Sequence, residues 1–252
     1  MAWTGRYDGE EPQRVNKWLG QSGVCSRREA EGLIAEGRVS IDGQTITDAG
    51  HKILPGQTLT LADAAGGTGP LSVVLHKPMG YVSAQPEQGQ IPAVRLLTEE
   101  ALVGESPAIP DRDTRLASLG RLDMDSRGLL ILSEDGVLAK AIIGPESDLE
   151  KEYLVKVTGK ITPEKVKLLC HGLTMDGRAL KPAKVTHLGG QELRFILKEG
   201  RNRQIRRMCE LVGMHVMDLV RIRIGTLNLG DLPEGRWRAL TSAERAALIG
   251  KS

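Results

Sequence analysis

A short segment about a quarter of the way along the chain divides the sequence into two parts. Asp63–Pro70 contains three glycines and one proline, and its only apolar side chains besides proline are alanines. A segment of this composition cannot bury a hydrophobic core, so it predicts a linker. We therefore expect a small module over residues 12–62, a linker over 63–70 and a larger module over 71–252.

The small module shows two helical patterns followed by short strands. Apolar residues at 15, 18 and 19 have helical spacing, and a second pattern begins near Ser26 and ends at Gly37. Ser26 with Glu29 three residues later predicts a capping box. The Asp42-Gly43 pair is typical of a hairpin turn, and the expected strands are 39–41, 45–47 and 58–61.

The larger module mixes strand and helix patterns. Apolar runs at 71–75 and 129–132 predict buried strands, and residues 137–143 predict a helix. Between the two strands, residues 98–116 form a polar, acidic stretch longer than the loops of compact domains, which indicates a peripheral insertion. The fold class expected for the whole chain is α+β.

Basic residues gather in one stretch of a nearly neutral chain, whose formal net charge is +2. Residues 194–223 contain eight basic side chains and three acidic ones. Such a local positive field suits a polyanion or a phosphorylated ligand, although a solvated helix face would have the same composition. The chain has only seven aromatic residues: three Trp, three Tyr and one Phe. This scarcity disfavours a protein that binds single-stranded nucleic acid by stacking many bases on aromatic side chains.

The sequence also limits where the protein acts. Its three cysteines are far apart, which excludes a disulfide framework or zinc ribbon and favours a reducing cytoplasm. No apolar run is long enough to predict a membrane helix, and the N-terminus lacks a secretory signal. A monomer is the default because no coiled-coil seam is visible. Cys25, at a helix start, is either an activated thiol or a buried apolar side chain, and the second is favoured.

Arg121 and Asp123 lie just before the apolar run at 129–132. On an extended backbone, residues two apart point to the same side. A guanidinium and a carboxylate held together beside a buried strand form either a functional site or a structural ion pair, and the pattern alone favours the ion pair.

The small module resembles the S4 RNA-binding domain. The resemblance rests on Arg14-Val-Asn-Lys17, on the segment Ser22–Ala30, on Gly37-Arg-Val39 and on the later Pro-Gly turn. It implies that Arg14, Lys17, Arg27 and Arg28 contact RNA phosphates, which agrees with the fit of an arginine fork to phosphate. The alternative is that Arg27 and Arg28 pair with Glu31 and other acids on the helix surface.

The larger module resembles the pseudouridine synthases of the RsuA/RluB/RluE/RluF family, which modify ribosomal RNA. Four motifs occur in the family's order: Gly120-Arg-Leu-Asp123 followed by Asp-Ser-x-Gly-Leu, then Lys151-Glu-Tyr-Leu-Val155, Glu199-Gly-Arg-Asn-Arg-Gln-Ile-Arg-Arg-Met-Cys-Glu210, and Gly235-Arg-Trp-Arg-Ala-Leu240. The resemblance implies a mixed, largely antiparallel sheet with flanking helices, and an active site in a cleft across that sheet.

The resemblance also implies roles for individual residues. Asp123 would be the catalytic carboxylate, either as a nucleophile or by stabilising and then deprotonating an intermediate. Arg206 would pair with it, and Tyr153 would stack on the target uracil and act late as a base. Arg121 would help displace the flipped base. Arg201, Arg203 and Arg207 are candidates for further contacts to the flanking phosphates, the alternative being that they face solvent. The resemblance implies a reaction that needs no cofactor and no metal. Its substrate would be ribosomal RNA, with transfer RNA as a second candidate substrate.

Two other functions remain open. A non-catalytic RNA-binding or ribosome-assembly factor would keep the fold without the reaction, but intact Asp123, Tyr153 and Arg206 argue against it. A glycoside or nucleoside hydrolase needs paired carboxylates, and Asp125 beside Asp123 imitates such a pair. Release of free uracil from RNA would favour the hydrolase.

Overall fold

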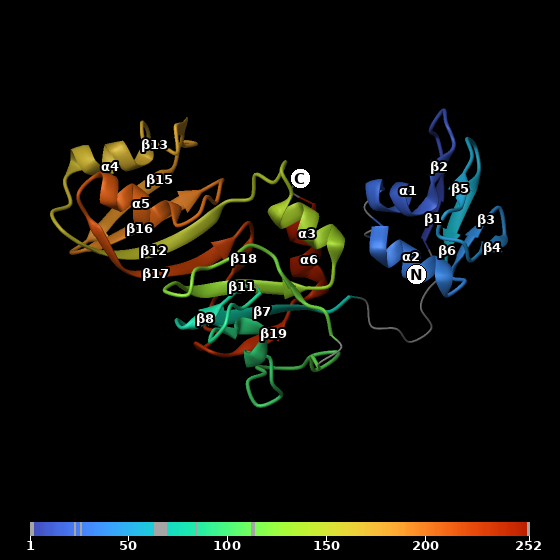
Figure 1. The fold of residues 1–252 in the computed structure, drawn as a ribbon, viewed down its shortest axis with the longest axis horizontal. Coiled ribbons are helices and arrows are strands. Elements are labelled where there is room, and N and C mark those ends of the chain that lie inside the picture. The colour runs from blue at the N-terminus through green and yellow to red at the C-terminus, as the bar shows by residue number, and fades with distance from the viewer. Residues whose placement is uncertain are drawn as a thin grey trace. The chain divides into compact units, whose positions relative to one another are not determined.

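The computed structural model describes residues 3–22, 24–25, 27–62, 70–83, 85–111 and 114–250. Its contacts divide the chain into two compact units, Met1–Leu71 with Glu134–Lys140, and Ser72–Ser133 with Ala141–Ser252 (Figure 1). Most of the predicted linker, residues 63–69, and the predicted helix cap Ser26 lie outside the described residues. The boundaries proposed from the sequence stay predictions.

The N-terminal unit combines two helices with a small sheet of order β1-β6-β3-β4. Strand β1 pairs with β6, so this sheet begins well before residue 12. The elements of the module are, in order, β1 (Trp3–Arg6), β2 (Gln13–Arg14), α1 (Val15–Gln21), α2 (Arg27–Ala35), β3 (Val39–Ile41), β4 (Gln44–Ile46), β5 (Lys52–Ile53) and β6 (Thr58–Leu61). Both helices and all three predicted strands are confirmed within one or two residues.

The core of this unit forms around an aromatic cluster. Trp18 on α1 packs against Trp3 and Tyr7, with ring centroids 5.7 and 5.5 Å apart. Cys25 is buried in the same core, and burial raises the pKa of its thiol to about 12. A thiol in that environment stays protonated and acts as a small apolar side chain.

The larger unit is built on a nine-stranded sheet with the main order β15-β16-β12-β17-β11-β7-β19. Every pair in it is antiparallel except β11 with β17, which confirms a mixed, largely antiparallel sheet. The strands of this sheet are β7 (Ser72–Lys77), β10 (Ala117–Ser118), β11 (Arg127–Ser133), β12 (Lys151–Thr158), β15 (Lys184–Gly189), β16 (Glu192–Leu197), β17 (His215–Ile224), β18 (Leu227–Asn228) and β19 (Trp237–Ala239).

Helices pack on this sheet, and the larger unit also contains short two-stranded pairs outside it. Helix α5 packs against β17 and α4 against β15 (Figure 1). Among the described residues, no helix has the length and apolar character that crossing a membrane requires. The remaining elements are β8 (Tyr81–Val82), β9 (Ile91–Pro92), the 3-10 helix η1 (Ala93–Leu96), α3 (Gly136–Ile143), α4 (Pro163–Cys170), β13 (Thr174–Met175), β14 (Arg178–Ala179), α5 (Gln204–Leu211) and α6 (Ser242–Ile249).

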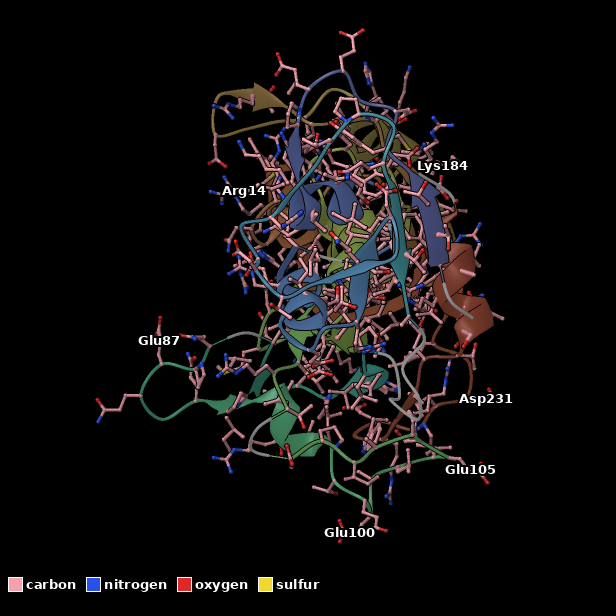
Figure 2. All side chains as sticks on the ribbon, turned by 90° about the vertical axis from the view of Figure 1, so that its right-hand side faces the viewer. Arg14, Glu87, Glu100, Glu105, Lys184 and Asp231 are labelled. Atoms are coloured by element: carbon pink, nitrogen blue, oxygen red, sulfur yellow. The ribbon has the colours of Figure 1, made fainter. Side chains whose placement is uncertain are left out.

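The acidic insertion covers an edge of this sheet. The indole nitrogen of Trp237 on edge strand β19 donates to the Thr98 carbonyl at 2.7 Å, and Val103 donates its backbone N–H to the Trp237 carbonyl at 2.8 Å. Glu100 and Glu105 project outward from the segment into solvent (Figure 2). An unpaired edge invites pairing with another chain, so this charged segment protects the sheet.

Candidate active site

Asp123 lies in a loop that leads directly into the central strand β11. Buried Leu119 and Leu122 fix this loop, and Ser83 bonds both the N–H and the carbonyl of Leu122. The N–H of Ser126 donates to the Asp123 carbonyl at 3.1 Å, which closes a turn just before the strand. The backbone therefore turns at residues 123–126, after the stretch from Arg121 to Asp123, and the side chain of Asp123 is about one third exposed (35%).

Among the described residues, the guanidinium nearest to Asp123 belongs to Arg203. Its Nη1 lies 3.7 Å from Asp123 Oδ2, and its Nη2 lies 2.9 Å from Asp125 Oδ2. Arg203 precedes α5 and has a left-handed backbone with φ of 49°. This conformation is uncommon for a side-chain-bearing residue, and such residues cluster at functional sites.

The predicted pairing of Arg206 with Asp123 is wrong. The side chain of Arg206 is only 9% exposed, and its Nε lies 3.3 Å from Asp125 Oδ2. Its Nη2 donates to the Asp125 carbonyl at 2.7 Å and to the Ser126 hydroxyl at 3.3 Å. Arg206 lies one helical turn beyond Arg203, so it reaches the base of the loop while Arg203 reaches its exposed tip. Arg206 therefore holds the loop instead of touching the carboxylate of Asp123.

Asp125 forms ion pairs with both arginines, and its side chain is 46% exposed. Burial opposes its ionisation, but the hydrogen bond from Arg203 and the charge of Arg206 outweigh burial and lower the pKa of Asp125. A carboxyl with a lowered pKa stays ionised and is unsuited to donate a proton near neutral pH.

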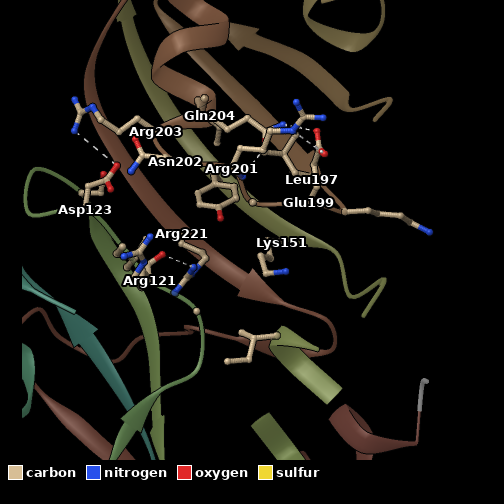
Figure 3. A pocket seen from close by; sticks show the side chains of 18 of the residues that line it. Arg121, Asp123, Lys151, Leu197, Glu199, Arg201, Asn202, Arg203, Gln204 and Arg221 are labelled. Atoms are coloured by element: carbon tan, nitrogen blue, oxygen red, sulfur yellow. Dashed lines mark hydrogen bonds and ion pairs between the residues drawn. The ribbon is translucent and has the colours of Figure 1, made fainter. Parts of the chain in front are cut away.

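The loop faces a pocket of about 370 Å³ on the sheet. This volume lies in the range of small-ligand sites, about 300–1000 Å³. Side chains from three strands form its sheet side, and the segment before α5 lines another side (Figure 3). The strand residues that line it are Lys151, Tyr153, Leu197, Leu219 and Arg221.

Tyr153 and Arg221 meet across neighbouring strands β12 and β17. They are Cα partners in the ladder, and both line the pocket. Arg221 is only 1% exposed; its Nε donates to the Leu129 carbonyl at 2.8 Å and its Nη1 to the Arg121 carbonyl at 3.3 Å. Its Nη2 is buried without a hydrogen-bond partner. Buried donors without a partner are uncommon, so this nitrogen is a candidate contact for a ligand in the pocket.

Nothing in the sequence pattern distinguishes Arg221 from Arg223, because a β-bulge between them sets the direction of Arg223. Arg223, two residues later, would share a face with Arg221 on a regular strand. The register shifts between Glu152 and Tyr153, however, and Arg223 instead bonds Glu152 at 2.7 Å. Bulges re-aim side chains in this way, and nothing in the local sequence announces this one.

A second buried cation, Lys77, lies behind the loop. It is completely buried, and its amine donates to the carbonyls of Pro78 at 2.8 Å and Tyr81 at 2.9 Å. Burial lowers its pKa to about 8, although the charges of Asp125 and Asp123 oppose that change. Lys77 thus adds positive charge beneath the two aspartates, and the sequence analysis did not select it.

The other basic residues predicted to contact RNA have different surroundings. Arg201 donates to the carbonyls of Met175, Arg178 and Ala179, so it fixes the β13–β14 hairpin to the pocket wall. Arg207 forms an exposed ion pair with Asp176 at 2.6 Å. Arg121 is exposed at the pocket, and within the described part of the chain no ion pair engages its guanidinium.

Three of the cations predicted in the N-terminal unit lie on adjoining turns. Arg14 and Lys17 are one helical turn apart, and the stem of Arg27 packs close to Gly20, one turn further along α1. All three are exposed, and in the described part of this unit no hydrogen bond or ion pair engages their side chains. Glu31, the acid of the alternative interpretation, accepts a hydrogen bond from Asn16. The side chain of Arg28 lies outside what the structure describes.

Comparisons with known proteins identify both units. Residues 72–211 match the family model described as RNA pseudouridylate synthase, and residues 13–59 match the S4 domain. The chain belongs to the RNA pseudouridine synthase family. The resemblance inferred from the four motifs is therefore confirmed, together with the α+β fold class.

Individual relatives support this membership. The chain is 37% identical to the dual-specificity RNA pseudouridine synthase RluF of Escherichia coli K12, over 92% of this chain and 76% of that protein. It is 34% identical to an uncharacterized RNA pseudouridine synthase of Aquifex aeolicus, over 94% of this chain and 93% of the relative. A crystal structure of a pseudouridylate synthase superposes with a TM-score of 0.64 at 26% identity, covering 94% of this chain and 99% of the other. Within the family, Ser126 and residues 203–210 also resemble RluF.

The loop contacts of the synthase predict unequal effects for two adjacent arginines. Arg206→Ala is expected to lower the free energy of unfolding by about 2 kcal/mol, because it leaves buried loop acceptors without their partner. Arg207→Ala is expected to change stability little, since its ion pair is exposed. Urea unfolding of both variants measures the difference; equal losses would contradict the loop-holding role of Arg206.

Proposed function

We propose that this synthase isomerises a specific uridine of 23S ribosomal RNA, with Asp123 as the nucleophile and with the target uridine flipped into the pocket. The observation that carries the proposal is the contrast between the two neighbouring aspartates. Asp125 is bound closely by two arginines and is not among the residues that line the pocket, whereas Asp123 lines the pocket and has one ion pair at 3.7 Å. Asp123 is thus the carboxylate that is free to reach a substrate.

The pocket suits a single flipped base. A uracil must leave its stack to reach Asp123, which costs a few kcal/mol. Tyr153 offers an aromatic ring beneath the base, and exposed Arg121 at the pocket can replace the base in the RNA or bind its phosphates. The side chain of Tyr153 is mostly buried and its position is fixed by β12, so it orients the base against Asp123.

The proposed reaction redistributes bonds without a redox change. Asp123 attacks C1′ of the ribose, and the bond from C1′ to N1 of uracil breaks with its electron pair left on the base. The base turns, C5 bonds to C1′ and the carboxylate leaves. C5 then loses its proton and N1 gains one, so no net proton is consumed. The proposed late base is the phenol oxygen of Tyr153, which takes the C5 proton as its own hydroxyl proton leaves to solvent, and N1 is protonated from solvent. The buried guanidinium of Arg221, with its unpaired Nη2, supplies positive charge on the same side of the pocket.

The rival hydrolase is less well supported by the surroundings of Asp125. An inverting or retaining hydrolase needs a protonated carboxyl as its general acid. Arg203 and Arg206 lower the pKa of Asp125, so this side chain is held ionised. We therefore favour isomerisation over release of free uracil.

The N-terminal module is proposed to hold RNA through its exposed cations. The triple variant Arg14→Ala, Lys17→Ala, Arg27→Ala is expected to weaken RNA affinity and to reduce the slope of log affinity against log salt by about two to three, because up to three phosphate contacts are lost. The rate at saturating RNA should stay within about twofold, since none of these residues lines the pocket. Filter binding over a salt series measures the slope, and an unchanged slope would contradict the proposed contacts.

A base-resolution pseudouridine map tests the proposed function. Total RNA is compared from cells with the gene, without it, and with Asp123→Asn. Loss of one 23S site in both altered strains supports the substrate and the nucleophile together. Loss at a transfer RNA site instead would replace the proposed substrate, and identical maps would contradict the proposal. Action as a monomer in the cytoplasm remains a prediction from the sequence.

A further inference from the structure

Lys151 extends the catalytic pocket on the side away from Asp123. It is the first residue of β12 and lines the same pocket as Tyr153, two residues later on that strand. Residues two apart on a strand share a face, so the two side chains project together from the sheet. Figure 3 shows Asp123 at one end of the pocket and Lys151 well apart from it, with Arg221 between them.

The amine of Lys151 has no compensating partner in the described chain. No hydrogen bond or ion pair engages it there. Glu199, the other acid that lines the pocket, already accepts from the side chain of Gln204 at 2.8 Å and from the backbone of Lys181 at 3.1 Å. Burial and the nearby charge of Arg221 lower the pKa of Lys151. A partly buried cation in this setting gains most from a ligand group that carries or develops negative charge.

The proposed function determines which group of the substrate lies beside Lys151. If Asp123 bonds C1′, then N1 of the uracil must lie at the Asp123 end of the pocket. C4 is opposite N1 across the six-membered ring, so its oxygen O4 is directed toward the far end. We propose that Lys151 donates a hydrogen bond to O4 of the flipped uracil and is a catalytic residue of the isomerisation; this inference rests on the proposed function.

The contact accounts for both rate and base selection. When the C1′–N1 bond breaks, the electron pair on N1 is conjugated through C6, C5 and C4 to O4, so negative charge builds on O4. An ammonium beside that oxygen stabilises the detached base. No proton is transferred from Lys151, and no bond to it forms. Because an ammonium only donates hydrogen bonds, it can donate to O4 of uracil but meets the amino group of cytosine as another donor.

Two substitutions on one strand test the role of Lys151. Lys151→Met removes the charge while keeping a long side chain, and Lys156→Met makes the same change at an exposed position five residues along β12, on the opposite face. The substrate is a synthetic RNA hairpin carrying the uridine found by the pseudouridine map. Single-turnover rates are expected to fall about 100-fold for Lys151→Met, with RNA affinity within about twofold, and to stay unchanged for Lys156→Met. Lys151→Arg should recover at least about a tenth of the rate.

RNA hairpins with a thio-substituted target uridine identify which uracil atom Lys151 contacts. With 4-thiouridine at the target, sulfur replaces O4 and accepts hydrogen bonds poorly, so the effect of Lys151→Met should shrink at least about tenfold. With 2-thiouridine the full effect should remain. An equal effect on all three RNAs would overturn the O4 contact. Loss of RNA affinity with an unchanged saturated rate would instead assign Lys151 to a backbone phosphate. Failure of the proposed function has a different readout from failure of the Lys151 contact. In that case the wild type and Asp123→Asn would give equal rates.

Discussion

Asp123→Asn is expected to lower the single-turnover rate of pseudouridine formation at least about a thousandfold, equivalent to about 4 kcal/mol of transition-state free energy. The amide keeps the size of the carboxylate but cannot attack C1′ as an anion. RNA affinity should stay within about twofold, because the variant keeps every arginine and lysine that can bind phosphate. Rates come from rapid-quench assays with excess enzyme.

The matched control for Asp123→Asn is Asp125→Asn. Asp125 binds Arg203 and Arg206, so its loss is expected to loosen the loop and lower Tm, yet to reduce the rate only about tenfold. A rate that falls more with Asp125→Asn than with Asp123→Asn would move the nucleophile to Asp125. A wild-type rate in Asp123→Asn would remove the carboxylate from the chemistry.

Local sequence patterns predicted the elements that depend on nearby residues. The Asp42-Gly43 turn has φ values of 48° and 83°, the left-handed pair that favours these two residue types in a hairpin. The apolar run at 129–132 forms the centre of β11, where burial on both faces needs no alternation. The strand begins earlier, at Arg127, because its first ladder partners come from β7 and β17 and not from its own sequence.

The arrangement of charges around the pocket depends on distant contacts, which explains the errors there. Arg203 and Arg206 belong to one motif, but only the packing of α5 decides which of them lies near Asp123 and which holds Asp125. Arg223 leaves the face that Arg221 shares with Leu219 because of a bulge opposite Glu152 and Tyr153. Residues 98–116 could be predicted as an insertion, but their cover of β19 depends on Trp237, more than a hundred residues later.

Gly128→Ala is expected to destabilise the larger unit by about 4 kcal/mol. Gly128 has a φ of 109°, and a Cβ placed there would lie 2.3 Å from the carbonyl oxygen and 2.6 Å from the nitrogen of Arg221. Both contacts are with backbone, so no side-chain rotation relieves them. Left-handed strain of about 1–3 kcal/mol adds to an overpacking cost of about 1–3 kcal/mol. Urea unfolding of the full chain measures the loss.

Activity should fall with stability in Gly128→Ala, because this glycine lies between two residues of the site. It pairs with Arg221 on β17 and with Lys77 on β7, and it follows the Asp123 loop by only two residues. Separating β11 from β17 would move Arg221 away from Asp123 even in molecules that stay folded. Gly200→Ala is the control for stability, since a Cβ there meets nothing within 4 Å; it is no control for activity, because Gly200 lines the pocket. If the free energy of unfolding of Gly128→Ala were within about 1 kcal/mol of the wild-type value, β17 could shift freely. The close approach of Gly128 to the backbone of Arg221 would then not be what positions Arg221.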